Sequence, residues 1–132
     1  HCETDWIVYR YADALTLLAE ALVRQSNTVT SEAIDLLNQV RTRAGLPPYT
    51  AGDFANTRDF LDKLLLERAH ELYFEGSRRQ DLIRDGSYIN RMNAKCKAFG
   101  QAELVTETHL LFPLRESVIN EGKGIIKQNP GY

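Results

Sequence analysis

The sequence has few of the residues from which metal centres and disulfide frameworks are built. It contains three histidines and two cysteines, Cys2 and Cys96, among 132 residues. The cysteines are far apart and neither belongs to a Cys-x-x-Cys pair. Because Cys96 follows a lysine in what looks like a solvent-exposed helix, we expect two free thiols. The start of a zinc-protease motif at His70-Glu71 lacks its second histidine, since Phe74 occupies that position. We therefore expect no metal and no cofactor.

The sequence also lacks a basic excess and a long apolar run. The formal net charge is -2, and basic residues are not interleaved with aromatic ones along one face. Nucleic-acid-binding domains normally carry a clustered basic patch, so we expect no nucleic-acid partner. No apolar run approaches the roughly 18 residues of a membrane-spanning helix. With 43% hydrophobic and 26% charged residues, the chain is typical of one ordinary globular domain.

The first half of the chain predicts a helical hairpin over residues 8–46. Four apolar residues at i, i+4, i+7 and i+11 predict a helix over about residues 8–25: Tyr11, Leu15, Leu18 and Leu22. Thr30 or Ser31 can cap a second helix, which Gly45 ends. Its apolar stripe is Ala33, Leu37, Val40 and Ala44. Small residues permit close approach of the two helices, as in tetratricopeptide-like repeats: Ala12, Ala14, Ala19, Ala21 and Ala33. One such hairpin cannot bury both of its faces, so further repeats are expected outside this segment.

The second half predicts more helices and an irregular tail, giving an all-α fold with little or no sheet. After a loop at 47–56, Thr57 can cap a third helix that runs to Glu75. Its inward residues are Leu61, Leu64, Leu65, Ala69 and Leu72. Short helices are expected over 79–85 and 88–99. The apolar run 110–114 contains Pro113 and is expected to lie extended across the core.

A charged segment follows the third helix and predicts a folded ionic corner. Glu67, Glu71 and Glu75 recur every four residues and share one helix face. Gly76 lets the chain turn, which would bring the arginines behind it back to these carboxylates. We predict that seven residues form this structural ionic motif: Glu67, Arg68, Glu71, Glu75, Arg78, Asp81 and Arg84.

The same carboxylates could instead be the acid and base of a glycosidase, in which one carboxyl group stays protonated near neutral pH. The flanking arginines argue against that role, because nearby positive charge lowers the pKa of a carboxyl group. No serine, histidine and aspartate arrangement or glycine-rich phosphate loop is present either. We therefore assign no catalytic residue. A hydrolase remains a weaker alternative, and it would need an essential acid between Glu67 and Glu75.

Three ordered segments of the chain carry a resemblance to a known family. The first is the hairpin, Tyr9 to Leu22 followed by Ala33 to Pro47. The second is the pattern Glu-Arg-x-x-Glu-Leu-x-Phe-Glu-Gly-x-Arg-x-x-Asp-Leu-x-Arg from Glu67 onward. The third is LLFPLRESVIN with the terminal KQNPGY. Together, in this order, they resemble the SusD/RagB family. The chain departs from the family pattern where Arg115 replaces a proline, Val118 follows Ser117, and Gly-Lys-Gly replaces an Asn-Pro.

The resemblance implies a non-catalytic protein of the outer membrane and cell surface in Bacteroidetes. Such proteins capture a nutrient, mostly a glycan, and deliver it to a SusC-like TonB-dependent transporter. Residues 1–132 would be a single C-terminal domain, with the hairpin at 8–46 and the helices and tail at 57–132. Membrane attachment would come through a lipid anchor outside this chain, since only His1 precedes Cys2.

The resemblance transfers no ligand-binding residue to this sequence. Sugar sites use exposed aromatic rings, and Trp6 and Tyr88 are weak candidates because they lie near predicted helix ends. The alternative to nutrient capture is a free-standing tetratricopeptide-like module that binds another protein.

Overall fold

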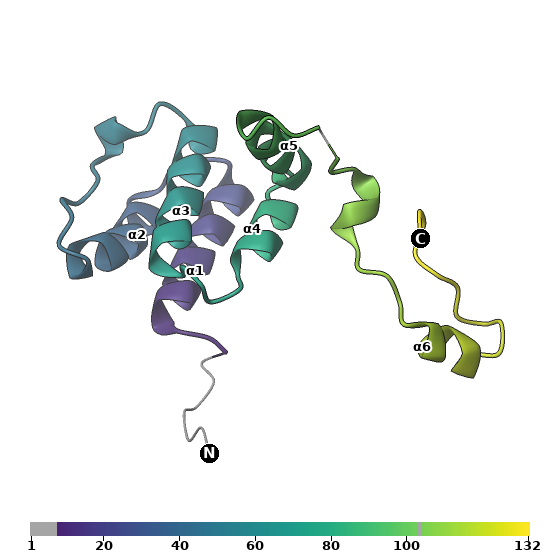
Figure 1. Cartoon of the computed structure of the whole chain (residues 1–132). Coiled ribbons are helices and arrows are strands. Elements are labelled where there is room, and N and C mark those ends of the chain that lie inside the picture. The colour runs from purple at the N-terminus through teal and green to yellow at the C-terminus, as the bar shows by residue number, and fades with distance from the viewer. Residues whose placement is uncertain (1–7, 103) are drawn as a thin grey trace, which may run out of the picture. The chain divides into compact units, whose positions relative to one another are not determined.

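The structure is a computed structural model that describes residues 8–102 and 104–132 (Figure 1). Trp6 and Cys2 therefore lie outside the described residues. Over the described ranges the chain is helical and contains no strand, as the sequence predicted. The α-helices are α1 (Tyr11–Ser26), α2 (Ser31–Arg43), α3 (Thr57–Glu71), α4 (Arg78–Arg84), α5 (Tyr88–Ala98) and α6 (Glu116–Glu121). The chain divides into two compact units, His1–Arg78 and Arg79–Tyr132.

Helices α1 and α2 form the predicted hairpin, and local signals fix both ends of α2. The Thr30 side chain accepts a hydrogen bond from the backbone N–H of Ala33 at 3.2 Å. At the other end Gly45 adopts φ +77°. Its N–H donates to the Thr42 carbonyl and the Leu46 N–H donates to the Arg41 carbonyl, both at 3.0 Å. The predicted cap and stop of this helix are thus confirmed.

The buried face of α1 differs from the predicted stripe. Leu15, Ala19 and Val23 are buried, whereas Tyr11 is 74% exposed and Leu18 is 48% exposed. The reason is that α1 contacts both α2 and α3 (Figure 1). Contact with two helices rotates the buried arc toward the polar side of α1, so Asp13, Thr16 and Glu20 are buried as well. Apolar spacing alone predicts the helix but not which of its apolar residues are covered.

Helix α3 packs against the hairpin and completes the core of the first unit. This core consists of Ala19, Val23, Ala33, Ile34, Leu37, Phe54, Phe60, Leu61 and Leu64. Asn56, and not Thr57, is the N-cap, because its side chain accepts a hydrogen bond from the Asp59 N–H at 3.0 Å. The helix ends at Glu71, before the predicted end. Phe74 adopts φ +65° and Gly76 φ +84°, so Glu75 lies in a turn.

The second unit contains most of α4, all of α5 and α6, and a tail that folds back on residues 108–114. Gln128 accepts a hydrogen bond from the Leu114 N–H at 2.8 Å and donates to the Leu114 carbonyl at 3.0 Å. The Tyr132 hydroxyl donates to the Leu111 carbonyl at 3.1 Å. The short helix α6 was not predicted. Leu111 and Phe112 are exposed, so the prediction that this run lies across a core is wrong.

Two glycines give a matched test of how Gly45 ends α2. Gly45 has open space for a Cβ atom but a left-handed φ, whereas Gly52 has an ordinary φ and a Cβ there would make only an ordinary contact, 3.8 Å from Thr50 Oγ1. We expect Gly45→Ala to lower the free energy of unfolding by about 1 kcal/mol, because alanine pays a steric penalty in that conformation. Gly52→Ala should leave it nearly unchanged. Urea unfolding followed by circular dichroism measures both, and equal effects would contradict the assigned role of Gly45.

Candidate functional site

A buried ion pair joins α3 to α1. Arg68 of α3 is 2% exposed, and its Nη2 lies 2.7 Å from Oδ1 of Asp13. Its Nη1 donates to the Thr16 hydroxyl at 2.6 Å. The Asp13 oxygen has no well-directed hydrogen bond, so its contact with Arg68 is mainly electrostatic. Because a buried charge without a partner is costly, this pair fixes the register between α1 and α3.

A second pair joins α3 to α2. The Glu67 carboxylate accepts a hydrogen bond from Nη1 of Arg41 at 2.7 Å, and both side chains are largely buried. The Arg41 guanidinium also lies 3.7 Å from the centroid of the Tyr49 ring and donates to the Pro47 carbonyl at 3.1 Å. Arg41 therefore ties α3, α2 and the loop after α2 together.

A third group of charges lies beyond the end of α3. Arg10 donates through Nη1 to Glu71 Oε1 at 2.8 Å. Its Nε and Nη2 donate to the two carboxylate oxygens of Glu75, at 2.9 Å and 2.8 Å. Arg43 pairs with the other oxygen of Glu71. Two arginines thus face two carboxylates, and the charges of the group balance.

Arg10 keeps Glu75 ionised. Its hydrogen bonds, more than its charge, hold the pKa of the Glu75 carboxyl below its ordinary value of 4.5. Hydrogen bonds to Glu75 and then to Glu71 raise the pKa of the Arg10 guanidinium. A carboxyl group held in its charged form near neutral pH can bind cations but has no proton to donate.

The predicted ionic motif therefore has different partners. From the sequence, Glu67, Glu71 and Glu75 were predicted to bind the arginines after Gly76. In the structure their partners are instead Arg41, Arg10 and Arg43.

The arginines after Gly76 have other contacts. Arg78 donates to the Leu65 carbonyl at 2.8 Å. Arg84 binds Asp81 at 3.0 Å. Arg79 donates to the His109 carbonyl at 2.7 Å. The sequence missed Arg10, Arg41 and Arg43 because no local spacing connects them to α3.

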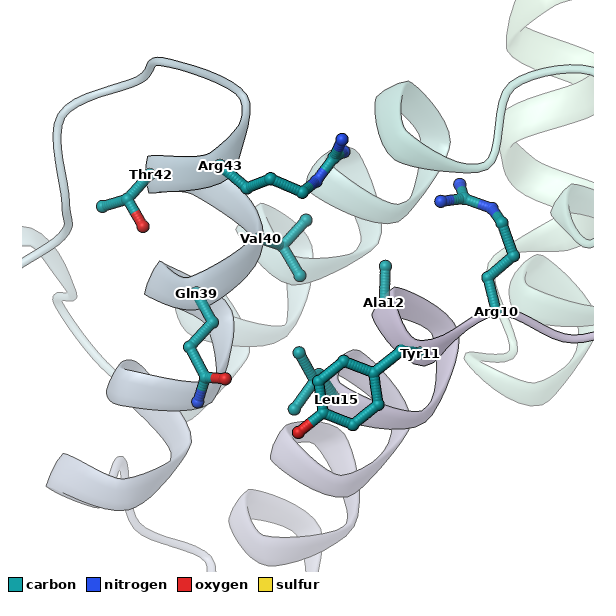
Figure 2. Close-up of a pocket in the computed structure, with 8 residues that line it drawn as sticks. All are labelled: Arg10, Tyr11, Ala12, Leu15, Gln39, Val40, Thr42 and Arg43. Atoms are coloured by element: carbon teal, nitrogen blue, oxygen red, sulfur yellow. The ribbon is translucent and has the colours of Figure 1, made fainter.

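A groove of about 710 Å³ lies between α1 and α2. Figure 2 shows the Tyr11 ring beside Leu15 on the α1 side and Gln39 on the facing helix. Its lining is Arg10, Tyr11, Ala12, Leu15, Gln39, Val40, Thr42 and Arg43. Since Glu71 and Glu75 neutralise the two arginines, the groove carries no strong net charge.

Of the two aromatic candidates, Tyr88 lies among the described residues, in the second unit. Trp6 lies outside the described residues. Tyr88 is the first residue of α5 and half-buried, with the Arg79 guanidinium 5.5 Å from its ring centroid. The same guanidinium lies 4.1 Å from the centroid of Phe112. Tyr88 thus belongs to an arginine-aromatic cluster inside the second unit.

Metal binding and membrane spanning have no support in the part of the chain that the structure describes. No cluster of three histidine, cysteine or acidic side chains suited to a metal ion occurs in residues 8–102 and 104–132. Over the same ranges, no helix combines the length and apolar character that crossing a bilayer requires. Cys96 is a half-buried free thiol, whereas the state of Cys2 stays a prediction.

Comparison with known proteins places the whole chain in one family. The sequence model of the SusD family matches residues 1–132. The chain belongs to the SusD family. A SusD-like protein of Formosa agariphila is 34% identical over 118 residues, which cover 85% of this chain and 22% of that protein. The starch-binding protein SusD of Bacteroides thetaiotaomicron is 29% identical, over 98% of this chain and 22% of its own length.

Solved structures of related proteins share the fold. A SusD homologue from Bacteroides thetaiotaomicron superposes with a TM-score of 0.82 at 33% identity, over 96% of this chain and 27% of that one. The surface glycan-binding protein A of the same organism gives 0.74 at 27% identity, over 95% and 24%. These matches confirm the predicted all-α fold and the family. The chain spans about a quarter of the length of the relatives it matches.

The buried pair predicts a large cost for removing one partner. Arg68→Ala should lower the free energy of unfolding by about 3 to 5 kcal/mol, because Asp13 would stay buried without its counter-charge. Arg58→Ala is the control, since Arg58 and Asp62 form an exposed pair four residues apart on one helix. That change should cost less than about 1 kcal/mol. Chemical denaturation measures both, and equal costs would contradict the role of Arg68.

If Arg68→Ala does not fold, the double variant Asp13→Leu with Arg68→Met keeps the test decisive. Replacing both charges by apolar groups of similar size should restore most of the lost stability, since no buried charge is then left alone. If the double variant were as unstable as Arg68→Ala, packing and not charge pairing would determine the loss of stability.

The Arg10–Glu75 contact predicts a pH-dependent contribution to stability. A depressed carboxyl pKa stabilises the fold above the ordinary value, and this contribution is lost as pH falls through the folded-state pKa. Arg10→Gln should therefore move the Glu75 pKa up toward 4.5. It should also destabilise the chain more at pH 7 than at low pH. Carboxyl-carbon NMR titration measures the shift, and the Asp53 pKa, lowered mainly by Thr50, should not move.

Proposed function

We propose that this chain is part of a protein that binds a nutrient of the glycan class without altering it. Two of the matched relatives are named for binding starch and surface glycans. The family match over all 132 residues carries the proposal. The protein would act at the outer membrane and cell surface through a lipid anchor outside this chain, and would pass its ligand to a SusC-like TonB-dependent transporter.

The described residues support a scaffold role for this portion of the protein. Its ionisable side chains near the groove are engaged with one another, as the Arg10, Glu71 and Glu75 contacts show. Such ion pairs hold the helices in place, and they leave few polar groups to form hydrogen bonds with sugar hydroxyls. We propose that the chain contributes a rigid helical frame, with Trp6 and Tyr88 kept as candidates for ligand contact.

We propose further that no reaction is catalysed here. Hydrolysis of a glycosidic bond needs one carboxyl group that keeps its proton near neutral pH. Glu67 and Glu71 form ion pairs with arginines of other segments, and the pKa of Glu75 is lowered. Glu75 therefore has no proton to donate near neutral pH, and the ion pairs of Glu67 and Glu71 hold helices together.

Calorimetric titration and product analysis test this proposal together. A family-length polypeptide containing these residues should bind one oligosaccharide from a panel that includes maltooligosaccharides. After long incubation, chromatography should recover that oligosaccharide at its original length. Shortened products would establish a hydrolase, and Glu71→Gln would then show whether this acid is essential. No binding across the panel, with capture of a protein partner instead, would favour the tetratricopeptide-like interaction module.

A further inference from the structure

Arg79 is a half-buried arginine whose partners among the described residues are uncharged. Its Nη2 donates to the carbonyls of His109 and Leu110, at 2.7 Å and 3.2 Å. Its guanidinium carbon lies 4.1 Å from the centroid of the Phe112 ring and 5.5 Å from that of Tyr88. Carbonyls and ring faces attract a cation, but they do not neutralise its charge.

The charge of Arg79 is handled differently from that of several arginines in the first unit. Arg10, Arg41 and Arg68 each bind a carboxylate. Helix α5, which begins at Tyr88, contains one arginine and two lysines but no acidic residue. A negatively charged group near Arg79 and Tyr88 would therefore meet a positive local field.

The Phe112 ring is held in an exposed position by hydrogen bonds to the backbone around it. Asn129 Nδ2 donates to the Phe112 carbonyl at 2.7 Å, and Gln128 binds both backbone groups of Leu114. Phe112 is nevertheless 67% exposed. A ring on a fixed backbone loses little conformational freedom when a ligand stacks on it. The second unit thus presents a pre-organised apolar surface beside a cation.

One ligand chemistry uses both the ring and the cation. The apolar face of a sugar ring can cover the flat surface of Phe112. Both carbonyl partners of Arg79 in the described ranges accept from Nη2, so Nε and Nη1 remain to donate to a ligand. Hydrogen bonds from a guanidinium to a carboxylate are stronger than those to a neutral hydroxyl. A neutral saccharide would use the ring alone, whereas a saccharide with a carboxylate uses both.

We infer that Arg79, Tyr88 and Phe112 bind an acidic oligosaccharide, one that contains uronic acid units. One sugar unit stacks on Phe112, and the carboxylate of a neighbouring unit accepts hydrogen bonds from Arg79. Tyr88 contacts the same guanidinium and helps to position it. The inference rests on the proposed binding of a glycan, and it names the chemical class of that glycan.

Calorimetric titration of the family-length polypeptide with trigalacturonate tests the inference. Arg79→Gln should weaken binding at least about tenfold, because a charged hydrogen bond is lost. Arg58→Gln also removes one positive charge, but from an exposed pair with Asp62, and should leave the affinity unchanged. Maltotriose has the same length without the carboxylates, and Arg79→Gln should not alter its affinity.

A second pair of variants tests the ring and keeps the inference falsifiable if Arg79→Gln does not fold. Phe112→Ala should also weaken trigalacturonate binding about tenfold, in line with the stacking energy of one aromatic ring. Phe99→Ala, at a residue that is 77% exposed, should have no effect. Because both rings are largely exposed, neither change should alter the melting temperature by more than a few degrees.

The outcomes separate this inference from the proposed function. Unchanged trigalacturonate affinity in Arg79→Gln or Phe112→Ala would overturn the inference and leave glycan binding intact. An equal loss for maltotriose and trigalacturonate in Arg79→Gln would also overturn it, since charge recognition would then not be the cause. Binding of another glycan but not of trigalacturonate would overturn the inference alone. Binding of no glycan at all would overturn the proposed function as well.

Discussion

Burial of the Arg68 guanidinium constrains the rest of the first unit. An arginine inside a protein needs a counter-charge and acceptors for its hydrogen bonds, and Asp13 and Thr16 supply both from α1. This requirement sets the rotation of α1, because its polar side must face α3. Once that side is turned inward, Tyr11 and Leu18 on the far side become exposed. One buried charge thus determines which apolar face of α1 belongs to the core.

The other ion pairs extend the same constraint along α3. Glu67 reaches α2 through Arg41, and Glu71 reaches both Arg10 and Arg43. Glu67 and Glu71 therefore contact different parts of the hairpin. Individual exposed pairs contribute little, but several partly buried pairs along one helix fix its position and direction against the others. The acidic segment therefore acts as a joint between helices.

Local chemistry made α1 to α5 predictable from the sequence. Thr30 caps α2, Gly45 ends it, and the glycines near 76 and 86 separate α3, α4 and α5. Each of these signals involves only four or five consecutive residues, so it can be recognised in the sequence alone. The end of α3 was not predicted correctly. Phe74 adopts a left-handed φ that bulky residues rarely take, so its residue type does not indicate that conformation.

The ion-pair partners were not predictable, for a different physical reason. Glutamates spaced by four residues on α3 share a face whatever surrounds them, so the sequence identifies the acidic set. Their partners come from positions such as Arg10 and Arg41, which reach α3 only after the hairpin has folded. Nearby arginines beyond Gly76 looked equally suitable, and charge alone does not distinguish the two sets. The direction in which the chain leaves α3 decides between them, and that direction depends on the turn from Leu72 to Gly76. Long-range charge pairing is therefore a consequence of the fold, and the same holds for the apolar face that the inward rotation of α1 leaves uncovered.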